Sequence, residues 1–381
     1  MPPNPNDGSQ QAHAAEPEVR FQEINGVGVI TLNRPRQLNA LSYPMIGALD
    51  AQLAAWAGRT DIVAVLLRGA GSKAFCAGGD IRALYDSFHA GTPLHRQFFV
   101  DEYQLDYRLH RYSKPLVALM DGIVMGGGMG LAQAAHLRVV TERSRVAMPE
   151  TGIGLVPDVG ASHFLSRLQL PLALYVGLTG VTLGAADTLL CGLADIAIHS
   201  TALEALEQTL AGISWRGDTL ANLRGALGAA AAATATLPSA AEAPMLEVLP
   251  ALLRHFRPEA SLADLIASLS TEADPRYAEW AARTLATLHS RSPLMAAVTR
   301  ELLLRGRRLD LADCFRMELG VVSNAFTRGD FIEGVRALIV DKDNAPRWRI
   351  ANPEEVSDAM VQSFFESPWP PGSHPLAAAL S

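Results

Sequence analysis

The chain contains little cysteine. Its three cysteines, Cys76, Cys191 and Cys314, are too few and too widely spaced for a disulfide framework. We therefore expect free thiols and a reducing compartment, with the cytoplasm as the predicted location. Residues 1–17 show neither a basic start followed by an apolar run nor an arginine-rich amphipathic pattern, so they predict neither secretion nor import. We expect a disordered tail over this segment.

Long hydrophobic runs and an excess of positive charge are also absent. No uninterrupted apolar stretch reaches the roughly 18 to 20 residues that a spanning helix needs, so we expect no membrane partner. A formal net charge of −7 argues against a nucleic-acid-binding surface, although a few basic residues could still contact a phosphorylated ligand. A hydrophobic content of 49% over 381 residues is enough for a substantial core in one large domain or two.

Three common catalytic motifs are missing from the sequence. It has no G-x-S-x-G, the pattern that raises a nucleophilic serine on a strained turn in thioesterases of the α/β-hydrolase type. Residues 69–75 contain Gly-Ser-Lys but lack the spacer of a phosphate-binding P-loop. None of the ten histidines forms a pair such as H-E-x-x-H, and the cysteine spacing is equally uninformative. We therefore predict no metal.

The first half of the chain alternates strand and helix patterns. Asn25-Gly26 is a dipeptide suited to a two-residue hairpin turn, and Ser42 is placed to cap a helix. Alternating strands and helices predict an α/β architecture. The expected strands are 19–24, 27–32, 62–69, 116–120 and 137–141, and the expected helices are 43–58, 93–112 and one from about 127.

Beyond residue 200 the pattern is predominantly helical. Residues 225–244 are rich in alanine, which favours a helix, while Pro238 and the serine and alanine around it favour a connector. We expect a core over 18–200, a helical region over 201–366 and an irregular tail over 367–381. Within the helical region, the expected helices are 245–256, 261–270, 276–290, 293–304 and 310–327.

Two glycine-rich turns follow buried strands. One holds Gly126, Gly127 and Gly128 at the start of a helix, and the other holds Gly79 in "KAFCAGGDI". Glycines let a ligand approach the backbone, and two backbone N–H groups aimed at one carbonyl oxygen form an oxyanion hole. Taken alone, a glycine run more often reflects tight packing.

The stretch "MPETGIGLVPDVG" at 148–160 places Glu150 and Asp158 among prolines and glycines. Those residues exclude one continuous helix, so we expect a shaped loop with short helical turns at most. By itself, each acid would be a solvated loop residue.

Five segments together resemble the crotonase (enoyl-CoA hydratase/isomerase) superfamily, and the resemblance spans residues 18–350. The pairing of "MPETGIGLVPDVG" with "EGVRALIVDKD" resembles the 3-hydroxyisobutyryl-CoA hydrolase branch. The resemblance implies a ββα spiral core with a helical C-terminal region. The five segments are "LNRPRQLNAL", "SKAFCAGGDIRALY", "ALMDGIVMGGGMGLAQAAHLRVV", "MPETGIGLVPDVGASHFLSRL" and "DFIEGVRALIVDKDNAPRW".

The resemblance also implies roles for individual residues. The substrate would be an acyl-CoA, whose thioester carbonyl lies between the N–H groups of Gly79 and Gly127, and no cofactor is needed because coenzyme A is part of the substrate. Glu150 and Asp158 match the branch's catalytic carboxylates, and Glu102 matches a substrate-contacting position. The remaining candidates, for the phosphates of the ligand, are Lys73 and Arg34.

Gly130 departs from the hydratase pattern. Hydratases of the superfamily usually have glutamate there, paired with the one that matches Glu150. Glycine cannot transfer a proton, so the resemblance favours thioester hydrolysis over hydration. Glu150 would activate water or attack the carbonyl itself, and Asp158 would orient the hydroxyl or water and assist proton transfer. Two alternatives are an enoyl-CoA hydratase or isomerase and a non-catalytic acyl-CoA binding protein.

Weaker expectations concern residues outside these motifs. His163 either faces the pocket as an acid or base or simply packs, and Cys76 is expected to be buried filler. Residues 331–348 either cover the acyl-CoA site or dock a neighbouring subunit. Superfamily members often form trimers, so a homo-oligomer is expected, although the added helices could leave a smaller assembly.

Overall fold

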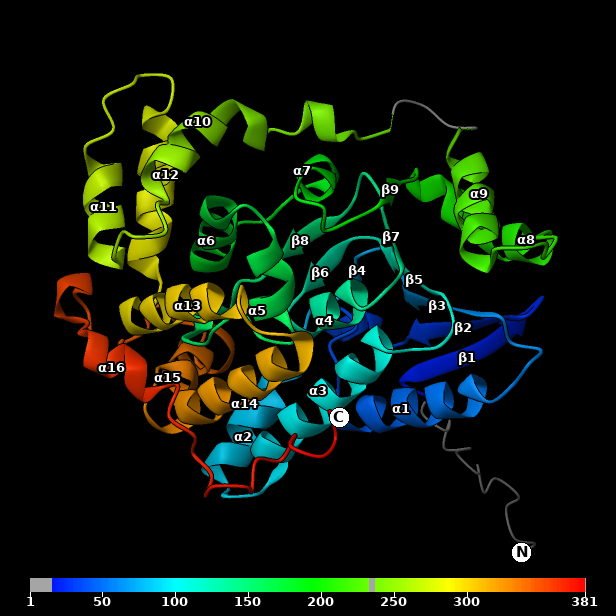
Figure 1. Ribbon diagram of the computed structural model, residues 1–381, viewed down its shortest axis with the longest axis horizontal. Coiled ribbons are helices and arrows are strands. Elements are labelled where there is room, and N and C mark those ends of the chain that lie inside the picture. Colours follow the sequence, from blue (N-terminus) through cyan, green and yellow to red (C-terminus); the bar gives the residue numbers. More distant parts are fainter. Residues whose placement is uncertain (1–15, 233–236, 381) are drawn as a thin grey trace, which may run out of the picture.

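A six-stranded sheet lies at the centre of the computed structural model, which describes residues 16–232 and 237–380 (Figure 1). Its strand order is β1-β2-β3-β5-β7-β9. The first two strands are antiparallel and the remaining neighbours are parallel, so the predicted α/β class is confirmed. The strands are β1 (Val19–Ile24), β2 (Val27–Leu32), β3 (Ala64–Gly69), β5 (Leu116–Met120), β7 (Leu137–Val140) and β9 (Ile196–Ala197).

The hairpin between β1 and β2 turns where the sequence predicts it. Asn25 and Gly26 have φ angles of 47° and 79°, which is the backbone of a primed turn. This turn fixes the register in which Ile24 pairs with Val27. The other expected strands are confirmed to within two residues at each end.

A second sheet, with three parallel strands, positions the functional turns. Its strands are β4 (Ala74–Cys76), β6 (Ile123–Met125) and β8 (Arg145–Ala147), in that order. Each follows a strand of the large sheet directly in the chain, and β4 and β6 each lead into a helix. Two strands and a helix therefore repeat along the chain, which is the ββα spiral that the resemblance implies.

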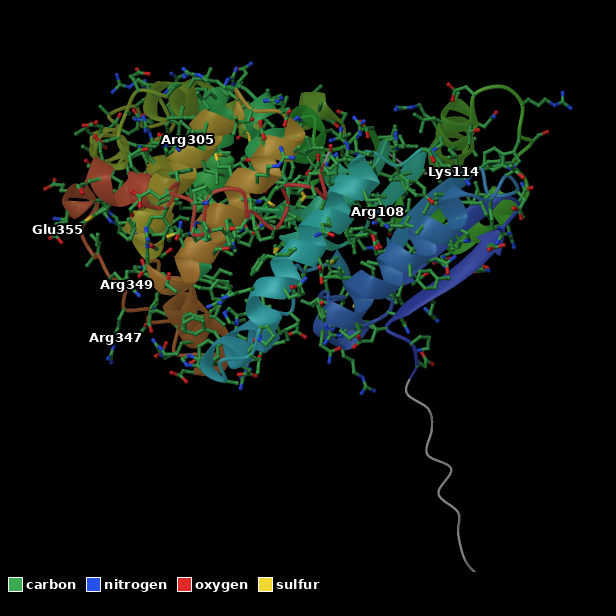
Figure 2. The ribbon with its side chains drawn as sticks, turned by 60° about the horizontal axis from the view of Figure 1, so that its bottom comes forward. Arg108, Lys114, Arg305, Arg347, Arg349 and Glu355 are labelled. Atoms are coloured by element: carbon green, nitrogen blue, oxygen red, sulfur yellow. The ribbon has the colours of Figure 1, made fainter. Side chains whose placement is uncertain are left out.

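Seven helices within residues 16–200 surround these sheets. Ser42 caps the first of them, because its hydroxyl accepts a hydrogen bond from the Met45 N–H at 3.4 Å. The long helix α3 has an exposed side, where Arg108 pairs with Asp50 at 2.8 Å, and a side buried against the core (Figure 2). The helices are α1 (Tyr43–Ala57), α2 (Ile81–His89), α3 (Leu94–His110), α4 (Gly127–Gln133), α5 (Ala161–Phe164), α6 (Leu170–Thr179) and α7 (Ala185–Leu190).

The second half of the described chain adds helices at two ends of the molecule (Figure 1). Helices α8 and α9 cover the outer face of the large sheet, where Leu210 and Leu223 join a small apolar cluster with Val29 and Val117. Helices α13 and α14 pack against the core helices α3, α5 and α6. The helices are α8 (Leu206–Ala211), α9 (Thr219–Ala232), α10 (Met245–His255), α11 (Leu262–Ser270), α12 (Ala278–Ser290), α13 (Pro293–Gly306), α14 (Leu311–Thr327), α15 (Phe331–Val335) and α16 (Asp358–Ser363).

The alanine-rich segment and the two terminal tails are described to different extents. Helix α9 extends into the alanine-rich segment, while 233–236 and most of the N-terminal tail, 1–15, lie outside the described residues. In the C-terminal tail, Leu376 and Leu380 are buried, so the tail packs on the protein. Within 16–232 and 237–380, no helix has the length and hydropathy needed to cross a bilayer.

Candidate active site

A cavity of about 330 Å³ opens at one edge of the small sheet. The turn after β4 brings Gly79 to it, the turn after β6 brings Gly127, and the turn after β8 brings Glu150. The carboxyl ends of parallel strands share one edge of a sheet, which is where ligands of α/β proteins bind. Three of the predicted site residues therefore converge because the small sheet aligns the turns that carry them.

The two predicted backbone donors lie in adjacent turns. A Cβ placed on Gly126 would be 3.3 Å from the Cα of Gly78, so the two backbones approach too closely for larger residues there. Gly126 also has a φ of 50° and a ψ of −125°, a backbone conformation that glycine adopts without the strain it causes in other residues. Within the described chain, neither the Gly79 N–H nor the Gly127 N–H donates to a backbone carbonyl. Both donors are therefore free to bind an oxygen of a ligand.

Glu150 begins a single 3-10 turn, Glu150–Ile153, directly after Pro149. Its side chain is 5% exposed, and its Oε1 lies 3.2 Å from where a Cβ of Gly126 would be. Its Oε2 has no hydrogen-bond partner among the described residues. Burial raises the pKa of Glu150 well above its usual value, and the nearby charge of Asp158 raises it further. A carboxylate with a raised pKa is a stronger base than one in water.

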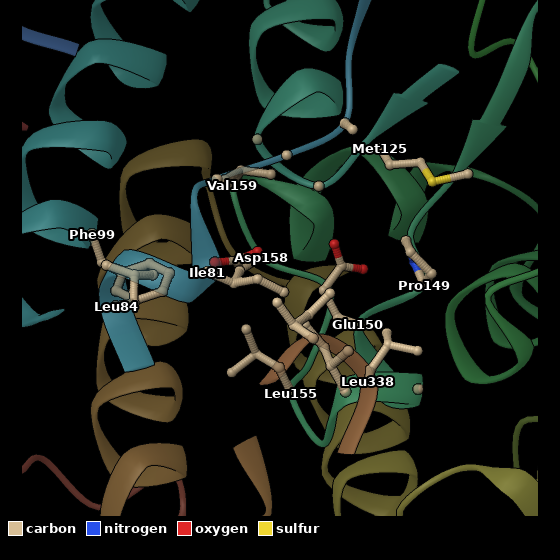
Figure 3. A pocket seen from close by; sticks show the side chains of 18 of the residues that line it. Ile81, Leu84, Phe99, Met125, Pro149, Glu150, Leu155, Asp158, Val159 and Leu338 are labelled. Carbon is tan, nitrogen blue, oxygen red and sulfur yellow. The ribbon is translucent and has the colours of Figure 1, made fainter. Parts of the chain in front are cut away.

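Asp158 faces the same cavity as Glu150 (Figure 3). The Tyr103 hydroxyl donates a hydrogen bond of 2.6 Å to its Oδ2. Burial raises the pKa of Asp158 to about 6, while the bond from Tyr103 acts in the opposite direction. Val159 follows with a φ of 53°, which is rare for a β-branched residue and marks local strain. The strained turn directs Asp158 into the cavity.

Glu102 reaches the cavity from α3. It is 2% exposed, and its Oε1 occupies space that a side chain on Gly127 would need. That oxygen has no partner within the described chain, and burial raises the pKa of the carboxyl well above its usual value. The predicted substrate-contacting residue is thus beside one of the predicted donors.

Comparisons with known proteins fit this geometry. A family model described as enoyl-CoA hydratase/isomerase matches residues 27–365. The chain belongs to this family. The 3-hydroxyisobutyryl-CoA hydrolase, mitochondrial, of Gallus gallus is 39% identical over 92% of this chain and 89% of its own length. The 3-hydroxyisobutyryl-CoA hydrolase 1 of Arabidopsis thaliana is 37% identical over 93% of this chain and 92% of its own length.

Solved structures give the same fold. A carnitinyl-CoA dehydratase from Mycobacterium thermoresistibile has a TM-score of 0.81 and 36% identity, covering 93% of this chain and 97% of its own. An enoyl-CoA hydratase from Rhodobacter sphaeroides 2.4.1 has a TM-score of 0.80 and 34% identity, covering 92% of this chain and 98% of its own. The resemblance to the crotonase superfamily and to its hydrolase branch is therefore confirmed.

Three charged residues near the site of this enoyl-CoA hydratase/isomerase family member escaped the sequence analysis. Asp106 is fully buried on α3 and lies beside Gly130. Glu318, on α14, accepts hydrogen bonds of 2.7 Å from the N–H groups of Gly160 and Ser162, just after Asp158. Arg291 lines the cavity and donates through its Nη2 to the Thr179 carbonyl at 2.6 Å. Each reaches the site from a distant part of the chain, so no local motif marks it.

The two predicted phosphate contacts do not line the cavity. Lys73 is exposed, and it stays a candidate for the outer part of an acyl-CoA. Arg34 is largely engaged within the protein, because its guanidinium contacts Glu18 at 3.1 Å and Asp80 at 2.9 Å. The structure thus gives Arg34 a role in fixing the turn that contains Gly79.

Segment 331–348, His163 and Cys76 can also be placed relative to the cavity. Leu338 and Ile339 line the cavity, so part of segment 331–348 covers it. His163 is half-buried outside the cavity lining, and Cys76 is buried as a free cysteine. Among the described residues, no group of three or more His, Cys, Asp or Glu side chains is arranged to hold a metal.

Proposed function

We propose that this chain hydrolyses a short, branched 3-hydroxyacyl-CoA thioester, with 3-hydroxyisobutyryl-CoA as the substrate. The observation that carries this proposal is the pairing of two free backbone donors, on Gly79 and Gly127, with the buried carboxyls of Glu150 and Asp158. Gly130 lacks the side chain that hydration would need. The curated relatives named as 3-hydroxyisobutyryl-CoA hydrolases support the same substrate.

We propose a step for each group. The thioester carbonyl oxygen accepts hydrogen bonds from the Gly79 and Gly127 N–H groups, which stabilise the negative charge of the tetrahedral intermediate. Glu150 takes a proton from water, which attacks the carbonyl carbon, or attacks that carbon directly. Asp158, held by Tyr103, orients the 3-hydroxyl group or the water and assists protonation of the leaving sulfur.

The two routes for Glu150 differ in the origin of an oxygen atom. A single turnover in H₂¹⁸O puts ¹⁸O into the first product if water attacks the thioester. If Glu150 attacks first, the C–S bond breaks, coenzyme A leaves and a mixed anhydride forms. When water then opens this anhydride at the Glu150 carbonyl, the oxygen of the first product comes from the Glu150 carboxyl and ¹⁸O enters the enzyme. Mass spectrometry of the product and of the peptide that contains Glu150 separates these outcomes.

The decisive experiment measures thiol release from 3-hydroxyisobutyryl-CoA. We expect steady release by the wild type and a loss of at least about 10³-fold in Glu150→Ala, with coenzyme A binding largely retained. Glu355→Ala serves as the control, because Glu355 is exposed (Figure 2) and does not line the cavity. Full hydrolysis by Glu150→Ala would sink the assignment. Double-bond hydration without thiol release would identify a hydratase, and binding without turnover would identify a binding protein.

Finer parts of the proposal concern the setting of the reaction. We propose a role in valine breakdown, a cytoplasmic location and a homo-oligomeric state. The buried free cysteines fit a reducing compartment, but the animal relatives are named mitochondrial, so fractionation of cells is the test of location. Light scattering of the purified protein measures the assembly.

A further inference from the structure

The buried face of α3 carries a line of ionisable side chains. Glu102, Asp106 and His110 are spaced four residues apart, which places them on one helix face with a rise of about 6 Å between neighbours. Arg108 points away from this face and pairs with Asp50 (Figure 2). The inward line starts at the cavity, which Glu102 lines, and ends at the last residue of α3.

All three side chains hold buried polar atoms without a hydrogen-bond partner in the described chain. These atoms are Oε1 of Glu102, both carboxyl oxygens of Asp106 and Nε2 of His110. Buried polar groups in native proteins nearly always have a partner, and internal water supplies it where the protein does not. The line therefore has the composition of a hydrated path.

Gly130 makes room for the middle member of this line. A Cβ built on Gly130 would lie 2.7 Å from Oδ2 of Asp106 and 2.8 Å from the Cβ of Val159. Any side chain at position 130 would thus displace the Asp106 carboxyl. The glycine that removes the acid expected in a hydratase also creates the site of Asp106.

Besides His110 and the thiol of Cys76, the ionisable groups near Asp106 are carboxyls. They are Glu102 on the same helix, Asp158 in the loop before α5, and Glu318 on α14. Burial raises the pKa of Asp106 well above its usual value, and the charges of Asp158 and Glu318 raise it further. Asp106 therefore binds a proton readily when its neighbours are ionised.

The outer end of the line consists of histidines. His110 faces His163 and His136, and burial lowers its pKa to about 4, so its imidazole is neutral and accepts a proton only transiently. His163 is half-buried and His136 is exposed, so the two histidines near His110 both contact solvent. A proton that reaches His110 thus has a short way to the surface.

The reaction itself needs an outlet for protons, if the proposed function holds. Attack by water forms a C–O bond and breaks the C–S bond; one hydrogen of the water goes to the sulfur, and the other is released because the product acid ionises at neutral pH. We infer that this proton leaves the site along α3, from Glu102 through Asp106 to His110, while the bound acyl-CoA fills the mouth of the cavity. Asp106 acts as a positioning and proton-holding residue and does not touch the substrate.

The test replaces Asp106 with a group of the same shape that cannot carry a proton. We expect Asp106→Asn to lower kcat about 10- to 100-fold, with KM changed less than about 2-fold and a larger solvent deuterium isotope effect on kcat. Asp101→Asn, on the exposed side of α3, serves as the matched control. A wild-type kcat and isotope effect in Asp106→Asn would overturn the proposal.

A second variant covers the case in which Asp106→Asn fails to fold. His110→Phe closes the outer end of the path, and we expect it to lower kcat at least about 5-fold with the same increase in isotope effect. His289→Phe, at an exposed histidine of α12, is its control. An unchanged kcat in a folded His110→Phe protein contradicts the path.

Thiol release by the wild type separates this proposal from the proposed function. If the wild type releases no thiol from any acyl-CoA offered, the proposed function fails, and infrared difference spectra between wild type and Asp106→Asn then test the path alone. A protonated-carboxyl band for Asp106 at pH 7 supports its proton-holding role. An ionised Asp106 at that pH refutes it.

Discussion

Two walls of the cavity are built in different ways. The donor wall consists of the turns that hold Gly79 and Gly127, each within three residues of the end of a small-sheet strand. The acid wall consists of Glu102, Glu150 and Asp158, which come from α3 and from the loop 148–160. The donor wall forms where β4 pairs with β6, because these two neighbouring strands of the small sheet align its two glycine turns. The acid wall exists only when distant segments pack together, and α14 secures it through Glu318.

The two walls also differ in charge, and therefore in how much they destabilise the folded protein. The donor wall consists of uncharged backbone, and within the described chain its two N–H groups have no backbone acceptor. The acid wall gathers carboxyls whose pKa values are all raised, with burial as the first cause. Active sites often combine such strain with function, because a stable arrangement of these groups would be less reactive. We therefore expect added side-chain volume to disrupt the donor wall. A change of pH or of side-chain charge should alter the acid wall.

The largest effect is expected from a methyl group on the donor wall. In Gly127→Ala, the new Cβ would overlap Oε1 of Glu102 and lie 3.2 Å from a methyl carbon of Leu41, so the turn must shift away from the carbonyl. Loss of one oxyanion donor costs about 10²- to 10³-fold in kcat. Gly47→Ala is the matched control, because no atom lies within 4 Å of its added Cβ. Unimpaired kcat in Gly127→Ala would remove Gly127 from the oxyanion hole.

At the acid wall we expect a smaller free-energy effect, on stability, with a defined dependence on pH. The pKa of Asp158 is about 6 in the folded protein, above its usual value of 3.8. The folded state thus binds the proton more tightly than the unfolded state, so this carboxyl lowers the free energy of unfolding as pH rises from about 4 to about 6. Asp158→Asn avoids this loss while its amide oxygen can still accept from Tyr103.

We therefore expect Asp158→Asn to be inactive yet more stable than the wild type at pH 8. At most about 3 kcal/mol separates the two, and the difference disappears below about pH 4. Denaturant unfolding at several pH values measures it, with the exposed Asp86→Asn as control. A variant that is less stable than the wild type at pH 8 would show that the acid wall is not strained.

The smallest effect is expected where α14 meets the acid wall. Glu318 accepts from Gly160 on one oxygen and from Ser162 on the other, and burial raises its pKa to about 8. Glu318→Gln leaves one of these donors facing an amide N–H, which costs about 1 to 3 kcal/mol of stability. Because the loop carries Asp158, we also expect kcat to fall several-fold.

Glu301→Gln on α13 is the matched control for that measurement, since Glu301 pairs with Arg305 near the surface. A thermal unfolding curve and a kcat determination for both variants are sufficient. If Glu318→Gln matches Glu301→Gln in both properties, the helical region does not hold the acid wall in place.

Much of the site could be predicted from the sequence because its motifs are short and continuous. The turn at Gly127 and the loop from Glu150 to Asp158 each lie within one stretch, where glycine and proline dictate the backbone. Asp106 left a weaker signal that was not used. It stands four residues after Glu102, on a helix face that also carries Leu105 and Leu109, and an acid on an apolar face is an anomaly.

Two other residues could not be assigned from their neighbours in the chain. Arg34 was expected to contact phosphates, but its partners are Glu18 and Asp80, and the pairing with Asp80 joins residues 46 positions apart. Glu318 sits among apolar residues of α14, and its function depends on contacts with a loop 156 or more positions earlier. Such contacts depend on tertiary packing, and the hydrophobic periodicity of one segment does not show which distant segment it will contact.

The sequence by itself determined the α/β class and the glycine turns, and it singled out Glu150 and Asp158 as the proposed reactive carboxyls, because these depend on backbone preferences and on residue type. Only the tertiary structure decided that Asp106 fills the space beside Gly130, that Glu318 holds the turn after Asp158, and that Leu338 covers the cavity. Each of these depends on how segments far apart in the chain pack, and burial in that packing is also what raises the carboxyl pKa values.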